Sequence, residues 1–94
     1  MRYRARVDEN QSTIVEDLRS LGCLVMHLHE LGRGRPDVLC ARAGKMYLFE
    51  IKNPKQPKSK RVLTKDEMFF NLVWKEYVHV IETVDDARMV MGMK

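Results

Sequence analysis

The amino-acid sequence predicts an α/β fold in which helices flank a mixed four-stranded sheet. A segment of helical apolar period comes first, and three short apolar segments separated by turn residues follow it. A second helical segment, a fourth strand and a short terminal helix complete the order α-β-β-β-α-β-α. Three strands joined by short turns form an antiparallel meander, whereas a strand, helix, strand order implies a crossover and a parallel neighbour.

The first helix is predicted at residues 9–21. Apolar side chains recur there at helical spacing and a glycine follows as a stop signal: Ile14, Leu18, Leu21 and Gly22. The same helical wheel turns Asn10 and Gln11 inward. Gln11 has two open interpretations: it reaches an acidic site on the sheet, or it satisfies free backbone N–H groups at the helix start.

Three strands follow, separated by glycine-containing turns, at residues 23–31, 38–41 and about 45–52. His27 and His29 alternate on one face of the first strand, where we favour packing over a metal pair because further ligands are not evident. Alternation along the third strand places its side chains on two faces: Tyr47, Phe49 and Ile51 on one, and Met46, Leu48, Glu50 and Lys52 on the other.

The second half begins with an exposed loop at residues 53–61, rich in proline and lysine. The letters TKDE, from Thr64, match a capping box, and Leu63 and Met68 are spaced as a hydrophobic staple for a helix that ends near Lys75. The segment YVHVIET is the fourth strand. Asp85 or Asp86 is expected to cap the terminal helix.

Composition indicates one small domain over residues 1–94. No apolar run reaches membrane-spanning length and no export signal is visible, so a cytoplasmic protein without a membrane partner is expected. Cys23 and Cys40 lack the spacing of a zinc site and are expected to be buried reduced thiols. Aromatic residues of the second helix (Phe69, Phe70 and Trp74) and the terminus ARMVMGM could furnish an apolar interface, although we expect at least half of these side chains to be core.

The net charge is +4, and the basic residues gather in three clusters. These are the N-terminal Arg2, Arg4 and Arg6, the glycine-loop Arg33 and Arg35, and the later Lys55, Lys58, Lys60 and Arg61. Such clusters suit contacts to a phosphate backbone, and simple solubilising charge is the alternative for each. We expect the second and third clusters to hold DNA phosphates without reading bases.

Asp37 at the start of the second strand and Glu50 at the end of the third form the most informative constellation. An antiparallel hairpin brings these two carboxylates together. Two neighbouring acids on an apolar sheet are costly unless a cation lies between them, and oxygen ligands favour Mg²⁺ or Mn²⁺. Lys52 lies on the same face as Glu50, where it either neutralises Glu50 or stabilises charge on a phosphate during attack.

Pro36-Asp37 followed by Glu50-Ile51-Lys52 resembles the PD-(D/E)xK nuclease signature, and the element order resembles the restriction-endonuclease-like core of that superfamily. The blocks DENQSTIVEDLRSLGC, GRGRPDVL, YLFEIKNP, LTKDEMFF and VHVIETVDDA are similar to the stand-alone, phage-type VRR-NUC (virus-type replication-repair nuclease) domain. The resemblance implies that Asp37, Glu50 and the main-chain carbonyl of Ile51 bind the metal, and that Lys52 assists catalysis. Gln11 stands where many relatives carry an acid, and Met68 where many carry a glutamine.

The resemblance also implies a Mg²⁺- or Mn²⁺-dependent DNA endonuclease that hydrolyses phosphodiester bonds. Domains of this minimal type are similar to archaeal Holliday junction resolvases, which act as homodimers on branched DNA. Such a phage-encoded protein would lie in the host cytoplasm. Two alternatives stay open: a catalytically weak or inactive module that binds branched DNA, and a flap or duplex nuclease of repair or restriction type.

Overall fold

A four-stranded mixed sheet in the order β1-β2-β3-β4 organises the chain in the computed structural model, which describes residues 9–93, without the side chains of Glu9, His29 and Lys60. The elements are α1 (Glu9–Ser20), β1 (Leu24–His27), β2 (Val38–Arg42), β3 (Lys45–Ile51), α2 (Lys65–Val73), β4 (Val78–Ile81) and α3 (Val84–Val90). Two short 3-10 helices, η1 (His29–Leu31) and η2 (Lys58–Lys60), lie in the connections. The predicted fold class and element order are confirmed.

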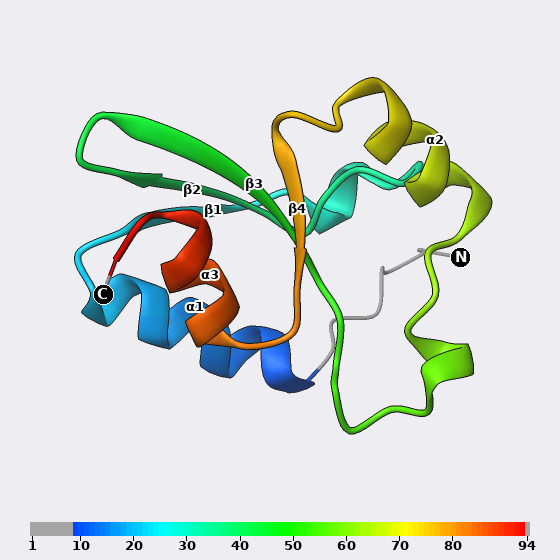
Figure 1. The fold of residues 1–94 in the computed structure, drawn as a ribbon, viewed down its shortest axis with the longest axis horizontal. Coiled ribbons are helices and arrows are strands. Elements are labelled where there is room, and N and C mark those ends of the chain that lie inside the picture. Colours follow the sequence, from blue (N-terminus) through cyan, green and yellow to red (C-terminus); the bar gives the residue numbers. More distant parts are fainter. Residues whose placement is uncertain (1–8, 94) are drawn as a thin grey trace.

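The strand register places the start of β2 beside the end of β3. The antiparallel β2–β3 hairpin pairs Val38 with Phe49, and its turn uses Ala43 and Gly44 at positive φ. β4 joins β3 in parallel, pairing Ile51 with Ile81, after the long excursion through α2 (Figure 1). The start of β2 therefore lies beside the end of β3.

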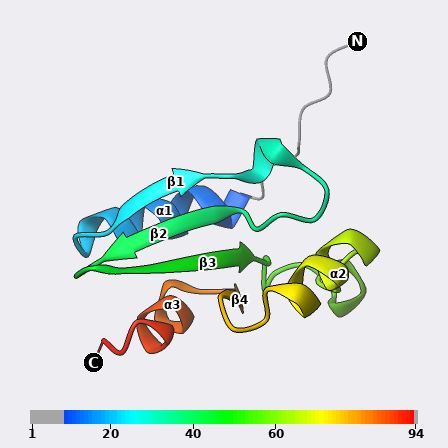
Figure 2. The same cartoon turned by 90° about the horizontal axis from the view of Figure 1, so that it is seen from above.

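The hydrophobic core lies between one face of the sheet and two helices. Figures 1 and 2 show α1 and α3 on the same side of the sheet, with α2 set apart from both. The core contains Ile14, Val15, Leu18, Cys23, Val38, Cys40, Phe49, Ile51, Ile81 and Ala87. Both cysteines are buried free thiols, as predicted. The predicted inward face of α1 is confirmed, and so is the predicted alternation of β3, whose Phe49 and Ile51 lie in the core with Tyr47 packed against it.

The helix α2 differs from the other helices because it contains no buried residue. Its start carries the predicted capping box, in which the Thr64 hydroxyl accepts from the Glu67 N–H and Glu67 accepts from the Thr64 N–H. Gly34 lies so close to the first turn of α2 that a Cβ there would overlap the backbone of Asp66. The glycine loop and the start of α2 therefore pack backbone to backbone.

Three expectations about local structure are wrong. The first strand ends at His27: a bond of 2.8 Å from the Leu28 N–H to the Asp37 carbonyl continues the pairing with β2 by one residue, and the chain then turns into η1, so that His29 lies outside the strand. Thr83, instead of Asp85 or Asp86, caps α3, and the carboxylate of Asp86 completes its capping box. The third expectation fails only for the aromatic residues: Phe69, Phe70 and Trp74 lie outside the core, whereas Ala87 of the terminal segment belongs to the core and Val90 and Met91 pack against it.

No helix within residues 9–93 combines the length and apolar character that crossing a bilayer requires. The basic cluster at Arg2, Arg4 and Arg6 lies outside the described residues.

Candidate active site

The carboxyl groups of Asp37 and Glu50 meet at the open end of the β2–β3 hairpin. Asp37 directly precedes β2, and its Oδ2 accepts a hydrogen bond of 2.7 Å from the Ile51 N–H. Glu50, the penultimate residue of β3, is only 3% exposed. Each of the two carboxyl groups shifts the pKa of the other, so the hairpin brings together the pair that the sequence predicted.

Lys52 joins this pair from the same side of β3. Its Nζ lies 3.7 Å from Oε2 of Glu50 and donates a 3.0 Å hydrogen bond to Oε1 of Glu67. The lysine head group is thus held between a strand residue and the first turn of α2. Because Glu67 also accepts from the Thr64 N–H, one carboxylate both caps α2 and holds Lys52.

Burial gives the acid pair an unusual charge state. Burial, the negative charges of Asp37 and Glu67, and the hydrogen bond with Asp37 raise the pKa of Glu50 to about 10. Burial also raises the pKa of Asp37 above its usual value, although hydrogen bonds from Ile51 and Glu50 oppose the shift. Without a cation, this pair therefore keeps a proton at neutral pH.

Lys52 and Glu67 remain a charged pair. Burial lowers the pKa of Lys52, but the hydrogen bond to Glu67 and the surrounding carboxylates outweigh it, so the net shift is upward. Burial raises the pKa of Glu67, yet the N–H of Thr64 and the ammonium of Lys52 lower it by more. A positive charge is thereby kept beside the acid pair at neutral pH.

The donor set fits a hard divalent cation. Oε1 of Glu50 is buried and has no hydrogen-bond partner among residues 9–93, and Asp37 supplies a second carboxylate. Oxygen donors of this kind suit Mg²⁺ or Mn²⁺. The described side chains contain no group of three or more histidine, cysteine or acidic residues arranged to hold a metal, so main-chain oxygen, as predicted for Ile51, and solvent would complete the shell.

The first turn of α1 is hydrogen-bonded to the residue that follows β3. The side-chain amide of Asn10 donates to the Lys52 carbonyl at 3.1 Å. Gln11 is 2% exposed, confirming that it points inward, but its Nε2 has no partner in the described part of the chain. No hydrogen bond joins Gln11 to Asp37 or Glu50 there, so a role for Gln11 in the site stays a prediction.

Two contacts of this site escaped the sequence analysis. Glu67 was visible only as the acid of a capping box, and Asn10 only as an inward residue of α1. Their partner, Lys52, is 15 and 42 residues away respectively. The capping signature predicts the orientation of the Glu67 side chain at the start of α2. No pattern in the sequence predicts that Lys52 lies close enough to donate a hydrogen bond to it.

The predicted DNA-contacting residues differ in how free their side chains are. Arg33, Arg35, Lys55 and Lys58 are exposed. Arg61 is instead partly buried and forms a 2.7 Å ion pair with Glu82, which partly neutralises its charge. The side chain of Lys60 lies outside the described residues.

The hairpin with its acid pair and lysine, the parallel fourth strand and the flanking helices define a restriction-endonuclease-like α/β fold. Among solved structures, the chain is similar to a VRR_NUC domain, with a TM-score of 0.62 and 20% sequence identity over 87% of this chain and 89% of that chain. This similarity confirms the fold that the sequence motifs predicted. No protein-family model matches the chain. A search of curated proteins also returned no match.

Proposed function

We propose that the chain is a single-domain, metal-dependent DNA endonuclease of the VRR-NUC type. The observation that carries the proposal is the buried Asp37–Glu50 pair beside a charged Lys52. A purely structural site would gain nothing from burying two carboxyl groups side by side, whereas a bound cation would stabilise both of them as carboxylates. The VRR_NUC fold of the chain adds independent support.

Each residue has a distinct role in this proposal. Asp37, Glu50 and the Ile51 carbonyl would hold the ion, and the Ile51 N–H orients Asp37. A bound Mg²⁺ or Mn²⁺ would supply positive charge to the scissile phosphate and acidify the attacking water. Lys52 donates hydrogen bonds to the phosphate oxygen on which charge grows, and its raised pKa keeps it charged.

The basic residues outside the site would hold the substrate. Exposed Lys55 and Lys58 on the β3–α2 connection, with Arg33 and Arg35 on the glycine loop, suit flanking phosphates. We extend the proposal to branched DNA and a homodimer, because two symmetric cuts in a four-way junction need two sites related by a two-fold axis. Such an enzyme would work in the cytoplasm, where its DNA substrate lies.

The decisive experiment compares cleavage of a mobile four-way junction with cleavage of a linear duplex of equal length, in Mg²⁺ and in Mn²⁺. The parent is expected to cut the junction faster. Asp37→Ala and Lys52→Ala should each cut at least ~100-fold more slowly, the scale of losing one charge-stabilising group. Lys45→Ala removes an exposed lysine at the far end of β3 and is the matched control.

Three results would contradict parts of the proposal. If the parent cuts no duplex, flap or junction and both variants behave like it, the chain is not a nuclease. Binding of the junction without cleavage, together with no Mn²⁺ site that Glu50→Ala abolishes in a calorimetric titration, would indicate a binding module. Equal cutting of junction and duplex would remove the preference for branched DNA.

A further inference from the structure

The glycine loop, residues 32–35, follows an unusual backbone path beside α2. Gly32, Arg33 and Gly34 have positive φ values of 65°, 54° and 76°, and the Arg35 N–H donates to the Gly32 carbonyl at 3.2 Å. Positive φ is open to glycine but strains an L-residue such as arginine. Strained backbone persists only where the surrounding structure holds it. Contacts outside the loop must therefore fix this path.

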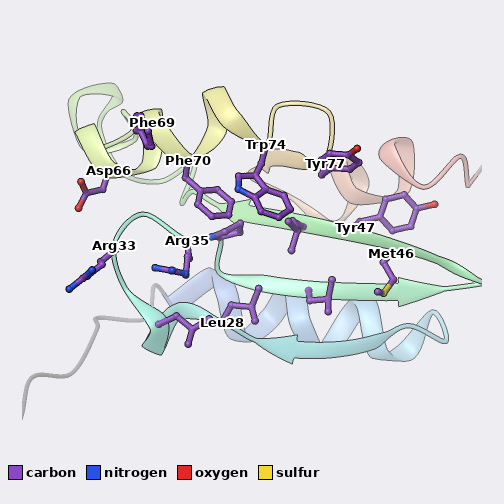
Figure 3. Close-up of a pocket in the computed structure, with 14 residues that line it drawn as sticks. Leu28, Arg33, Arg35, Met46, Tyr47, Asp66, Phe69, Phe70, Trp74 and Tyr77 are labelled. Atoms are coloured by element: carbon purple, nitrogen blue, oxygen red, sulfur yellow. The ribbon is translucent and has the colours of Figure 1, made fainter.

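Contacts at Pro36 and at Gly34 hold the loop on two sides. Pro36 is fully buried, and its ring restricts its own φ. Gly34 lies so close to α2 that a Cβ there would overlap main-chain atoms of Asp66 and Glu67. Figure 3 shows this loop, marked by Arg35, against the end of α2 that carries Asp66. Because main-chain atoms in a helix cannot rotate aside as a side chain can, the loop and the first turn of α2 keep a fixed spacing.

The first turn of α2 holds the Glu67 carboxylate in one orientation. Its capping box joins the Glu67 N–H to the Thr64 hydroxyl at 3.1 Å, and the Thr64 N–H to Oε1 of Glu67 at 2.9 Å. The same Oε1 accepts a 3.0 Å hydrogen bond from Nζ of Lys52. The side chains of Lys52 and Glu67 are only 13% and 17% exposed, so water and salt screen this pair weakly. The capping turn is therefore the anchor of the lysine.

Lys52 depends on this anchor for the position of its ammonium group. A lysine side chain is a flexible four-carbon stem that carries three N–H donors. Glu67 accepts from one donor, whereas Oε2 of Glu50, at 3.7 Å, lies beyond hydrogen-bond distance. An ammonium group held in this way keeps donors for a phosphate oxygen. Because a misplacement of about 1 Å can slow catalysis about 100-fold, the position of Glu67 bears on the rate.

We infer that Gly34 is a positioning residue for cleavage: its contact with the main chain of α2 sets the position of Glu67, and Glu67 sets that of Nζ of Lys52. The same loop leads, three residues after Gly34, to Asp37, the carboxylate proposed to bind metal. One loop therefore places Asp37 along the chain and Lys52 across the contact with α2. The role in cleavage rests on the proposed nuclease function, whereas the effect of Gly34 on the position of Lys52 does not.

Gly34→Ala and Gly32→Ala form the matched pair that tests the positioning. Both place alanine at positive φ in the same loop, but at Gly32 no atom of the described residues beyond its chain neighbours lies within 4 Å of the new Cβ. Single-turnover cleavage of a four-way junction in Mn²⁺, with the protein in excess, should be at least ~10-fold slower in Gly34→Ala than in Gly32→Ala. The affinity for the junction without metal, measured by fluorescence anisotropy, should be the same in both variants. A change in rate without a change in affinity separates positioning from DNA contact.

The position of Lys52 has a readout that needs neither DNA nor metal. The rate at which an acylating reagent modifies Lys52, followed by mass spectrometry, rises when the amine loses its contact with Glu67 and becomes more exposed. Modification of Lys52 should be severalfold faster in Gly34→Ala than in Gly32→Ala. Cys40 is 0% exposed in the core, so its reaction with a thiol reagent measures the unfolded fraction, which is subtracted for each variant.

A second pair tests the same link without any change at Gly34. Thr64→Ala and Thr83→Ala each remove the hydroxyl of one capping box at an exposed position, so both variants should fold. Only Thr64→Ala loosens the turn that Gly34 contacts. It should speed the modification of Lys52 and lower the hydrogen-exchange protection of the Arg35 amide severalfold, and Thr83→Ala should match the parent in both. The Arg35 amide is hydrogen-bonded within the loop, so a change there must cross the Gly34 contact.

Equal modification of Lys52 in Gly34→Ala and Gly32→Ala overturns the inference. So does a Thr64→Ala variant whose Arg35 amide is as protected as in the parent, and this result decides alone if Gly34→Ala does not fold. Faster modification of Lys52 in Gly34→Ala, combined with equal cleavage rates for the matched pair, overturns the role in cleavage. Faster modification in a chain whose parent cuts no DNA supports the positioning of Lys52 and refutes only the proposed nuclease.

Discussion

Glu50→Gln should stabilise the metal-free protein at neutral pH while removing its response to metal. The pKa of Glu50 is raised from 4.5 to about 10 in the fold. The stabilising contribution of its protonated form is fully present below pH 4.5 and is lost as the pH rises through about 10. The free energy of unfolding should therefore fall with a slope of up to ~1.4 kcal/mol per pH unit in this window. Between pH 6 and pH 8 the loss is about 2.7 kcal/mol for one proton.

The assay is urea unfolding at pH 6, 7 and 8 in the presence of a chelator, at one fixed protein concentration. The parent should lose stability across the series, and Glu50→Gln should lose much less, because the glutamine amide does not ionise. At pH 8 the variant should therefore be the more stable protein. Adding Mn²⁺ should stabilise the parent, since the ion binds only the folded acid pair, and should stabilise the variant far less.

Glu76→Gln, which removes an exposed glutamate next to β4, serves as the control and should follow the parent in both conditions. Equal slopes for the parent and Glu50→Gln would refute the reasoning, because the buried carboxyl would then not carry the pH dependence. A Glu50→Gln variant that is less stable than the parent at pH 8 without metal would refute it as well.

Three further predictions follow from contacts around the site. Gly34→Ala and Gly44→Ala both place alanine at positive φ, 76° and 78°, at a cost of roughly 1–2 kcal/mol each. Only at Gly34 would the new Cβ overlap the backbone of Asp66, so urea unfolding should show a further loss of stability of about 1–3 kcal/mol for Gly34→Ala. Equal losses for the two variants would contradict this. Glu67→Ala and Asp86→Ala each remove one capping box and should each lower stability by about 1 kcal/mol. Only Glu67→Ala should slow cleavage and shift the basic limb of the pH–rate profile to lower pH, because the pKa of Lys52 falls when its carboxylate partner is lost. A pH–rate profile that stays the same in Glu67→Ala would show that Glu67 does not raise the pKa of Lys52. Lys55→Ala and Lys58→Ala should each reduce the magnitude of the slope of log K against log[salt] for DNA binding by about 1. Fluorescence anisotropy at several salt concentrations measures this slope. A slope that stays at the parent value would show that these lysines do not contact phosphate.

Local pattern was enough to predict much of this protein. The helical period of Ile14 and Leu18, the turn before Lys45 and the capping letters from Thr64 each act between residues close in sequence, and each appears as predicted. The proximity of Asp37 and Glu50 also follows locally, since one short turn closes the hairpin and its register leaves few choices.

Contacts between distant segments were beyond such reasoning. Glu67 reaches Lys52, and Arg61 reaches Glu82, only because the long β3–α2 connection returns the chain to the end of the sheet. Alternation and capping signals describe one element at a time, and they carry no information about where a long connection places the next element. The exposed apolar surface of α2 has the same origin: its apolar pattern is that of a face to be covered, whereas the packing of residues 9–93 leaves this face exposed.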